Sequence, residues 1–353
     1  SFISQMAYNY ANRYFLNASF RIDQSSTFNK QNRTAMFPSV SAAWVVSNEE
    51  FFNSSAITNL KLKVSWGKTG MKDIGASKYL EAFDYSTQYD NHSAATATQM
   101  ANANLKWEQT DQFNVGAEIG IKDWLSLDLN WYRNKTNDLL VYRDLPPSGG
   151  FSQQWQNLGS VINTGFEAAL LTTPVKTRDF RWDLDFEIAY NKNWLTGFGE
   201  GVTVTKSNYS GVSQVYHDGG QLATWYLREY AGVDPQTGRN TYIDANGNKT
   251  FDYASARYIE AGSPIIPWQG GLSTALSWKN FKLSATSNFV WGNQLYGRSR
   301  ASELATWVGN SLLPSNEDKI WRRPPSIIRV IWSVATTSRS ATSPFPTPFP
   351  NRS

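Results

Sequence analysis

The chain has 353 residues, of which 41% are hydrophobic, 14% aromatic and 18% charged, with a formal net charge of +4. It contains no run of about 18 apolar residues, which excludes a transmembrane helix. It contains no cysteine, which excludes a disulfide scaffold, a thiolate metal site and a cysteine nucleophile. Its two histidines, His92 and His217, lie far apart in polar stretches, so a Ser-His-Asp triad or a multi-histidine metal site lacks material.

Alternation of apolar and polar residues predicts strands along most of the chain. In chain order, twelve crossings are expected near residues 2–11, 13–23, 37–46, 59–68, 110–120, 123–134, 137–143, 159–173, 180–191, 221–232, 268–279 and 281–291. The pattern is clearest over 180–190, where the apolar face is Phe180, Trp182, Leu184, Phe186, Ile188 and Tyr190. Strands of about ten residues match a tilted crossing of a bilayer.

The connections between these strands alternate between short and long. Turns such as 121–123 and 279–280 are short, whereas long polar segments occupy 69–109, 144–157, 192–220 and 233–267. Tryptophans lie near strand ends, as Trp124 and Trp131 do, where an aromatic girdle meets lipid headgroups. The 15 Trp and 17 Tyr, with few charges, suit a chain in contact with lipid, and no Lys/Arg stripe indicates nucleic acid. We therefore favour an all-β, antiparallel transmembrane β-barrel over a soluble β-sandwich, whose strands are usually about 5–6 residues long.

Six motifs follow one another over roughly residues 1–295: FPSVSAAW (37–44), LKLKVSWG (60–67), NLKWEQT (104–110), WYRNKT (131–136), NLGSVINTGFE (157–167) and NKN (191–193). Their order resembles the C-terminal barrel of SusC/RagA-type TonB-linked outer-membrane receptors. The resemblance implies a partial barrel, with about 12 strands of a barrel of about 22. No plug-like α/β segment is present in the sequence, so we expect the plug domain to be absent from it.

The same resemblance implies a function, a location and partners. It implies TonB-dependent, energy-coupled uptake of nutrients across the bacterial outer membrane, mostly oligosaccharides and sometimes peptides. The implied partners are a SusD-type surface lipoprotein and the TonB–ExbB–ExbD complex, and no cofactor is implied. One alternative is a surface glycan-binding protein or adhesin that does not transport. Another is an outer-membrane hydrolase, but the sequence shows no convergent acid–base pair, so we expect no enzyme.

We divide the chain into a partial barrel over 1–295, a loop or unassigned segment over 296–321, and a proline-rich tail over 322–353. The tail contains no Asp or Glu and six of the 14 prolines, including PFPTPFP at 344–350. Proline cannot lie inside a paired strand. We therefore expect no sheet in the tail and interpret it as disordered, or as an aberrant end such as a frameshift would produce.

Aromatic and amide residues outside the clearest strands are the candidate ligand contacts. Gln154 and Trp155 lie in one long polar segment, and Trp225, Tyr226 and Arg228 lie in the expected strand 221–232. Rings stack on the apolar faces of sugars, while amides and charged groups bind hydroxyls. The alternative is that the rings only pack within the loops or the girdle.

Acidic residues are the other candidates. Asp183, Asp185 and Glu187 share the polar face of the expected strand 180–191. Paired carboxylates hydrolyse glycosides, but a row of polar residues is also what a water-filled lumen presents, and we expect lumen-facing residues. The turn Asp244–Asn248 begins like a calcium loop, but Lys249 stands at the position that needs glycine, so we expect a polar turn and no metal site.

Overall fold

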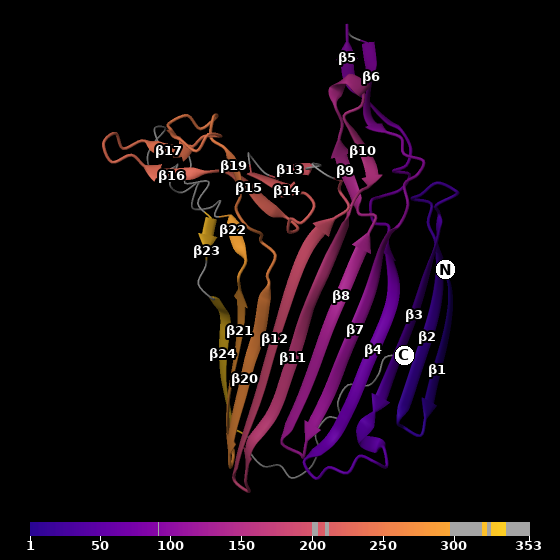
Figure 1. The fold of residues 1–353 in the computed structure, drawn as a ribbon, viewed down its shortest axis with the longest axis vertical. Coiled ribbons are helices and arrows are strands. Elements are labelled where there is room, and N and C mark those ends of the chain that lie inside the picture. Colours follow the sequence, from indigo (N-terminus) through magenta and orange to yellow (C-terminus); the bar gives the residue numbers. More distant parts are fainter. Residues whose placement is uncertain (91, 200–203, 209–211, 297–319, 323–325, 337–353) are drawn as a thin grey trace.

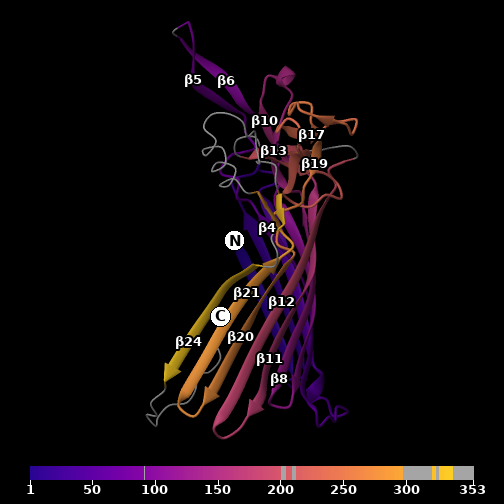
Figure 2. The ribbon, with the colours of Figure 1, turned by 90° about the vertical axis from the view of Figure 1, so that its left-hand side faces the viewer.

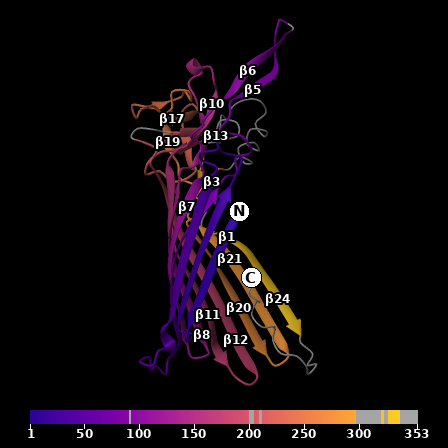
Figure 3. The same cartoon turned by 90° about the vertical axis from the view of Figure 1, so that its right-hand side faces the viewer.

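The computed structural model describes residues 1–90, 92–199, 204–208, 212–296, 320–322 and 326–336. Its main feature is one antiparallel sheet of eleven strands, tilted and curved like part of a barrel wall (Figure 1, Figure 2). In sheet order the strands are β1 (Phe2–Tyr10), β2 (Tyr14–Gln24), β3 (Thr34–Val45), β4 (Ile57–Met71), β7 (Glu108–Ile121), β8 (Leu125–Asn137), β11 (Ser160–Lys176), β12 (Phe180–Thr196), β20 (Trp268–Trp278), β21 (Phe281–Trp291) and β24 (Ser326–Thr336). Strands β1 and β24 are its two edges (Figure 3).

No helix within the described ranges is long and apolar enough to span a membrane.

Ten of the twelve expected crossings are strands of this sheet, which confirms them. The other two are wrong. The segment 137–143 contributes β9 (Leu140–Asp144), and 221–232 contributes β15 (Thr224–Arg228) and β16 (Tyr230–Val233), all of which belong to small separate sheets. A left-handed backbone at Asp138 (φ 59°) and at Ala223 (φ 58°) turns the chain away from the barrel strands at these places.

The expectation that 322–353 contains no sheet is also wrong in part. Residues 326–336 form β24 and pair with β21 from Val290↔Ser326 to Phe281↔Thr336. The run SIIRVIWSVAT is rich in β-branched residues, and Pro324 and Pro325 precede its first residue rather than interrupting it. Most of 296–321 and all of 337–353, including PFPTPFP, lie outside the described residues, so the division there stays a prediction.

The long connections gather at one end of the sheet and the short turns at the other (Figure 1). The long ones form four small sheets within the described residues. The first contains β5 (Ala82–Tyr89), β6 (His92–Met100), β10 (Gln153–Asn157) and β9, and the second contains β13 (Val204–Asn208), β14 (Val212–Tyr216), β15 and β19 (Tyr258–Glu260). The third contains β16, β17 (Asn240–Ile243) and β18 (Lys249–Thr250), and the fourth pairs β22 (Gln294–Tyr296) with β23 (Ile320–Arg322). The described 3-10 turns are η1 (Val46–Asn48) and η2 (Pro147–Gly149). Short turns on one side and long loops on the other are typical of outer-membrane barrels, with the short turns periplasmic.

The register divides the large sheet into an apolar and a polar face. One row of directly paired residues reads Leu16, Ala42, Val64, Val115, Trp131, Phe166, Tyr190, Trp268 and Trp291 across nine strands. The next row reads Lys63, Gly116, Asn130, Glu167, Ala189 and Gln269. Side chains alternate between the two faces of a strand, so the large sheet presents rings and aliphatic groups on one side and polar groups on the other.

Aromatic residues form two bands on the apolar face. One band contains Tyr190 and Trp268, whose ring centroids are 4.6 Å apart, and the other contains Trp278 and Phe281, at 6.4 Å. Trp268 and Trp278 lie at the two ends of β20, about 33 Å apart at ~3.3 Å per residue. With a strand tilt of ~40° the bands are about 25 Å apart along the membrane normal, the height of the apolar belt of an outer-membrane barrel.

Fully buried side chains occur mainly under the long connections rather than in the barrel wall. One cluster contains Phe28, Ala35, Phe37, Leu105 and Trp107. In it the Trp107 ring lies 5.5 Å from Phe28 and 5.8 Å from Phe37, and its Nε1 donates to the carbonyl oxygen of Arg33 at 3.1 Å. The cluster fixes the segment before β7 to the top of β3.

We predict that Trp107→Ala destabilises this end of the protein by about 3–5 kcal/mol, because it empties a filled core position. The measurement is the rate of proteolysis of the segment 72–107 in folded protein, which should rise steeply. Trp124→Ala is the matched control, because Trp124 is 42% exposed in the turn between β7 and β8. Equal proteolysis of the two variants would contradict the assignment of a core to this cluster.

Candidate functional site

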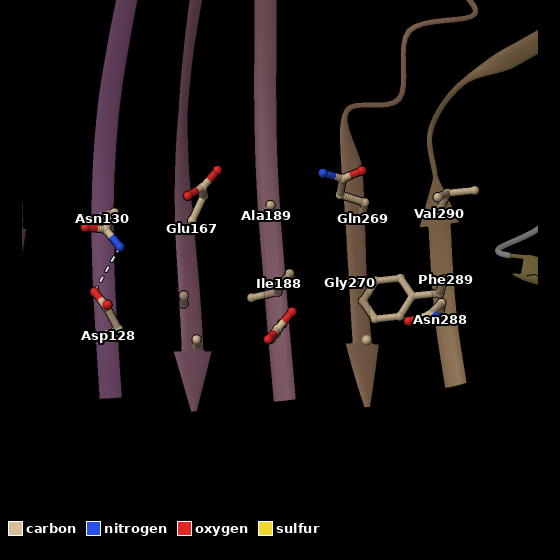
Figure 4. A pocket seen from close by; sticks show the side chains of 14 residues that line it. Asp128, Asn130, Glu167, Ile188, Ala189, Gln269, Gly270, Asn288, Phe289 and Val290 are labelled. Carbon is tan, nitrogen blue, oxygen red and sulfur yellow. Dashed lines mark hydrogen bonds between the residues drawn. The ribbon is translucent and has the colours of Figure 1, made fainter. Parts of the chain in front are cut away.

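The polar face of the sheet carries a shallow pocket of about 530 Å³ over β8, β11, β12, β20 and β21 (Figure 4). Its polar side chains come from five neighbouring strands and are Asp128, Asn130, Glu167, Glu187, Gln269 and Asn288. In the register Ala189 lies between Glu167 and Gln269, and Gly271 lies between Glu187 and Asn288. These small residues hollow the surface between longer polar groups, as a hydrated wall requires.

The carboxylates of this polar face differ in whether a cation lies beside them. Lys63 on β4 contacts Glu118 at 2.9 Å and Asp128 at 3.1 Å. Glu167 and Glu187 lie farther along the sheet, and among the described residues no Lys or Arg lies within 4.0 Å of either carboxylate. Carboxylates without a cation in a wet groove can accept hydrogen bonds from hydroxyl or ammonium groups of a passing solute.

The structure brings Asp183, Asp185 and Glu187 together on the polar face of β12. Asp183 is paired with Arg181 at 2.8 Å and accepts a hydrogen bond of 2.8 Å from Thr173 Oγ1. Asp185 lines a second pocket with Asp183 nearer the short turns, and Glu187 lines the first. Their contact with a solute in the lumen stays a prediction. Two other polar residues of the first pocket, Asp128 and Asn130, were signalled by the same alternation, since they fall on the polar face of 125–131. Sequence alone did not single out Glu167, Gln269 or Asn288.

Gln154 and Trp155 lie on β10, among the long connections. The Trp155 ring stacks on Tyr142 at 5.0 Å and packs against the cluster around Trp107. Gln154 Nε2 donates to the carbonyl oxygen of Ala101 at 2.7 Å. Both side chains therefore have structural partners. A contact between either one and a ligand stays a prediction.

Trp225, Tyr226 and Arg228 lie on β15, in a different small sheet from Gln154 and Trp155. Trp225 Nε1 donates to the carbonyl oxygen of Gln294 at 2.9 Å. Tyr226 stacks on Tyr258 at 4.8 Å. The sequence placed these two sets of candidates in different segments, and the structure places them in different small sheets.

Arg228 is at the centre of an aromatic ladder that the sequence did not reveal. Its guanidinium lies 4.6 Å from the Tyr258 ring and 5.0 Å from the Tyr253 ring. Its Nη1 also donates to the carbonyl oxygens of Ala254 and Ala256, at 2.8 Å and 2.5 Å. Tyr253 and Tyr258 remain more than two-fifths exposed. The ladder presents two partly exposed tyrosine rings and a held cation at the surface. The sequence carried no signal for it, because residues 253–258 have no regular period.

The family of the chain follows from sequence comparison. Residues 2–305 match the family described as "TonB dependent receptor-like, beta-barrel". The chain belongs to this family of TonB-dependent receptor barrels. It is therefore an outer-membrane β-barrel protein, and its apolar face, with the two aromatic bands, is the lipid-facing surface.

Individual relatives support the SusC/RagA type. The chain is 30% identical over 342 residues to the TonB-dependent receptor SusC of Bacteroides thetaiotaomicron, covering 88% of the chain and 33% of that relative. It is 29% identical over 356 residues to the TonB-dependent receptor P3 of Formosa agariphila, covering 92% and 35%. A solved structure of the RagAB peptide transporter matches with a TM-score of 0.73 and 28% identity, covering 85% of the chain and 34% of that structure's chain. The TonB-dependent receptor chain thus spans about a third of the length of these relatives.

His217 supplies a pH-dependent contact in the extracellular part of this receptor barrel. Its Nδ1 lies 2.9 Å from the carbonyl oxygen of Asp218, and its Nε2 lies 2.6 Å from Glu260 Oε1 on β19. The Asp218 carbonyl, then the Glu260 carboxylate, raise the pKa of His217 above its usual 6.5. A raised pKa means that the contact stabilises the fold fully below pH 6.5 and is lost as pH rises through the raised value.

We predict slower amide hydrogen exchange in residues 213–228 and 258–263 at pH 6 than at pH 8.5, after correction for the intrinsic exchange rate. Glu260→Gln should reduce this difference, because the neutral amide no longer favours the imidazolium, while the Asp218 carbonyl remains. Glu50→Gln, at the opposite end of the sheet, is the control and should keep it. A pH difference of equal size in both variants would contradict the role of the His217–Glu260 contact.

Proposed function

We propose that the chain forms part of the wall of a TonB-linked transporter that imports oligosaccharides across the outer membrane. The observation that supports this most is the polar wall over five neighbouring strands, with amide and carboxylate groups set between small residues. Such a wall offers many weak hydrogen bonds, which suit a solute that must pass rather than stay. Two partners are proposed with it: a SusD-type surface lipoprotein at the extracellular end and the TonB–ExbB–ExbD complex at the periplasmic end.

The extracellular residues support a carbohydrate as the first choice of ligand. Tyr226 and Tyr258 form a stacked pair beside Arg228, and Gln154 and Trp155 lie on a second small sheet. Rings with nearby amide and charged groups are the composition of a sugar-binding surface. We propose Tyr226 and Arg228 as contacts for the arriving oligosaccharide, with Gln154, Trp155 and Trp225 supporting the surface.

A peptide is the second candidate. The name of the RagAB peptide transporter supports it by similarity. The carboxylates of Glu167 and Glu187, which lack a Lys or Arg partner among the described residues, favour a peptide with basic side chains. The remaining alternative is a glycan adhesin, which would bind the same class of ligand at the cell surface but would not carry it across the membrane.

The test is uptake of radiolabelled oligosaccharides and basic peptides by cells that carry the gene and by cells from which it is deleted. We expect oligosaccharide uptake that needs the gene and stops when a protonophore collapses the inner-membrane gradient. Peptide uptake with no oligosaccharide uptake would replace the ligand class. Surface binding without uptake would contradict transport and support the adhesin.

Two variants extend this test to the site. Tyr226→Ala should weaken oligosaccharide capture about tenfold, or ~1.4 kcal/mol, because one stacking ring is lost. Tyr85→Ala is the matched control, since Tyr85 lies on the separate hairpin β5–β6 and is 67% exposed. Equal capture by the two variants would remove Tyr226 from the ligand site while leaving the transport proposal intact.

A further inference from the structure

The lipid-facing surface has a hollow over β1, β2, β3, β4 and β7. The hollow is a groove of about 500 Å³. Its outward-facing lining is apolar and comprises Tyr8, Tyr14, Leu16, Ala42, Trp44, Leu62, Val64 and Val115. None of these side chains carries a charge, so the groove excludes hydrated ligands and suits a hydrocarbon.

The groove exists because a small residue lies between larger ones. Ala42 is the register partner of Leu16 on β2 and of Val64 on β4, and its methyl group leaves a depression between those side chains. At the end of the sheet that carries the short turns, the groove is bounded by the stacked pair of Tyr14 and Trp44, with ring centroids 6.4 Å apart and planes at 10°. The result is a shallow groove that is open toward the lipid and whose floor is formed by Ala42.

The lower end of the groove lies at headgroup depth. Trp44 Nε1 donates to Glu49 Oε1 at 2.9 Å, which fixes the indole at the boundary between strand and periplasmic turn. Indole and phenol rings take up this position in membranes, with an apolar body in lipid and a polar edge in water. A hydrocarbon in the groove would therefore begin near Trp44 and run toward the membrane centre.

A cation stands beside this end. Arg13, one residue before β2, contacts Glu49 at 3.2 Å and Glu50 at 3.5 Å. The Glu49 side chain is only 8% exposed and is held in place, but Glu50 is 91% exposed. An ion pair to so exposed a carboxylate contributes little to stability, so a phosphate can take the place of Glu50 on the guanidinium.

We propose that this groove binds one acyl chain of a glycerophospholipid from the periplasmic leaflet, with the lipid phosphate on Arg13. Continuity with the lipid-facing surface makes lipid the adjacent phase, and the apolar lining with a cation at its periplasmic end matches a chain joined to a phosphate. The inference rests on the membrane location of the barrel and is independent of what the receptor transports. It is a site for an ordered lipid at one position on the barrel, distinct from the lipid that covers the rest of the apolar face.

The test is native mass spectrometry of the protein extracted in mild detergent from outer membranes, with the lipids that stay bound identified by fragmentation. The native protein should retain one glycerophospholipid. Ala42→Leu fills the groove and should lower the retained fraction at least fivefold. Arg13→Gln should lower it about two- to threefold, because the apolar contact remains.

Ala285→Leu is the matched control. Ala285 lies on the same apolar face, since its partner Thr274 pairs with Leu184, and it does not line this groove. It should retain lipid like the native protein. Ala42→Val, a smaller change, should give an intermediate loss if Ala42→Leu does not fold.

Three results would overturn the proposal. The first is equal lipid retention in Ala42→Leu and Ala285→Leu. The second is retention of lipopolysaccharide in place of glycerophospholipid, which would place the site in the other leaflet. The third is a dimer that Ala42→Leu dissociates, which would make a second copy of the chain the occupant of the groove.

Discussion

A backbone N–H or C=O group in hydrocarbon has no water to bond, so it must be paired with another strand. This requirement determines most of the structure. The longest ladder joins β11 and β12 from Ser160↔Thr196 to Lys176↔Arg181, with a single irregularity between Thr172 and Val175. Long ladders in register hold every side chain to one face or the other. The separation of a lipid-facing surface from a polar wall is a direct result.

Outside the membrane the requirement is relaxed, and a different interaction holds the chain. The extracellular strands are short and belong to several small sheets. Two buried clusters fix them to the barrel: one through Phe37 on β3 and Trp107 before β7, the other through Val161 on β11 and Leu195 on β12. Residues such as Trp155 and Tyr216 pack against these clusters from the connecting segments. The proposed ligand contacts are therefore carried on a rim that the barrel itself makes rigid.

Sequence alone predicts the features that follow from the two-residue alternation of side chains along a strand. The strand predicted over 180–191 begins at the right residue, although β12 continues to Thr196, and its polar face, Asp183 to Glu187, lies together as the alternation indicates. Sequence fails where the sheet that a segment joins depends on which strand it pairs with. The segments 137–143 and 221–232 carry apolar and aromatic residues like the barrel strands, but Asp138 and Ala223 take left-handed conformations that no glycine signals. Strand β24 was missed because prolines on both sides of 326–336 concealed a run of β-branched residues.

The candidate site shows the same limit. Composition identified Trp155 and Trp225, but it could not show that one packs on a core and the other bonds to a carbonyl oxygen. Nor could it find the ladder of Arg228, Tyr253 and Tyr258, which comes together from three segments of one long connection. Alternation specifies which face of a strand a side chain occupies. A surface site depends on which loops meet, and contacts between residues far apart in the sequence determine that.

Strand β12 separates lipid from water, residue by residue. The chain contains no cysteine, so single cysteines can be placed at each position from 182 to 188 and labelled in whole cells with a small water-soluble maleimide. We predict labelling at 183, 185 and 187 and protection at 182, 184, 186 and 188. Uniform labelling, or labelling of the even positions, would contradict the assignment of the two faces and with it the polar wall, the lipid-facing surface and the groove on it.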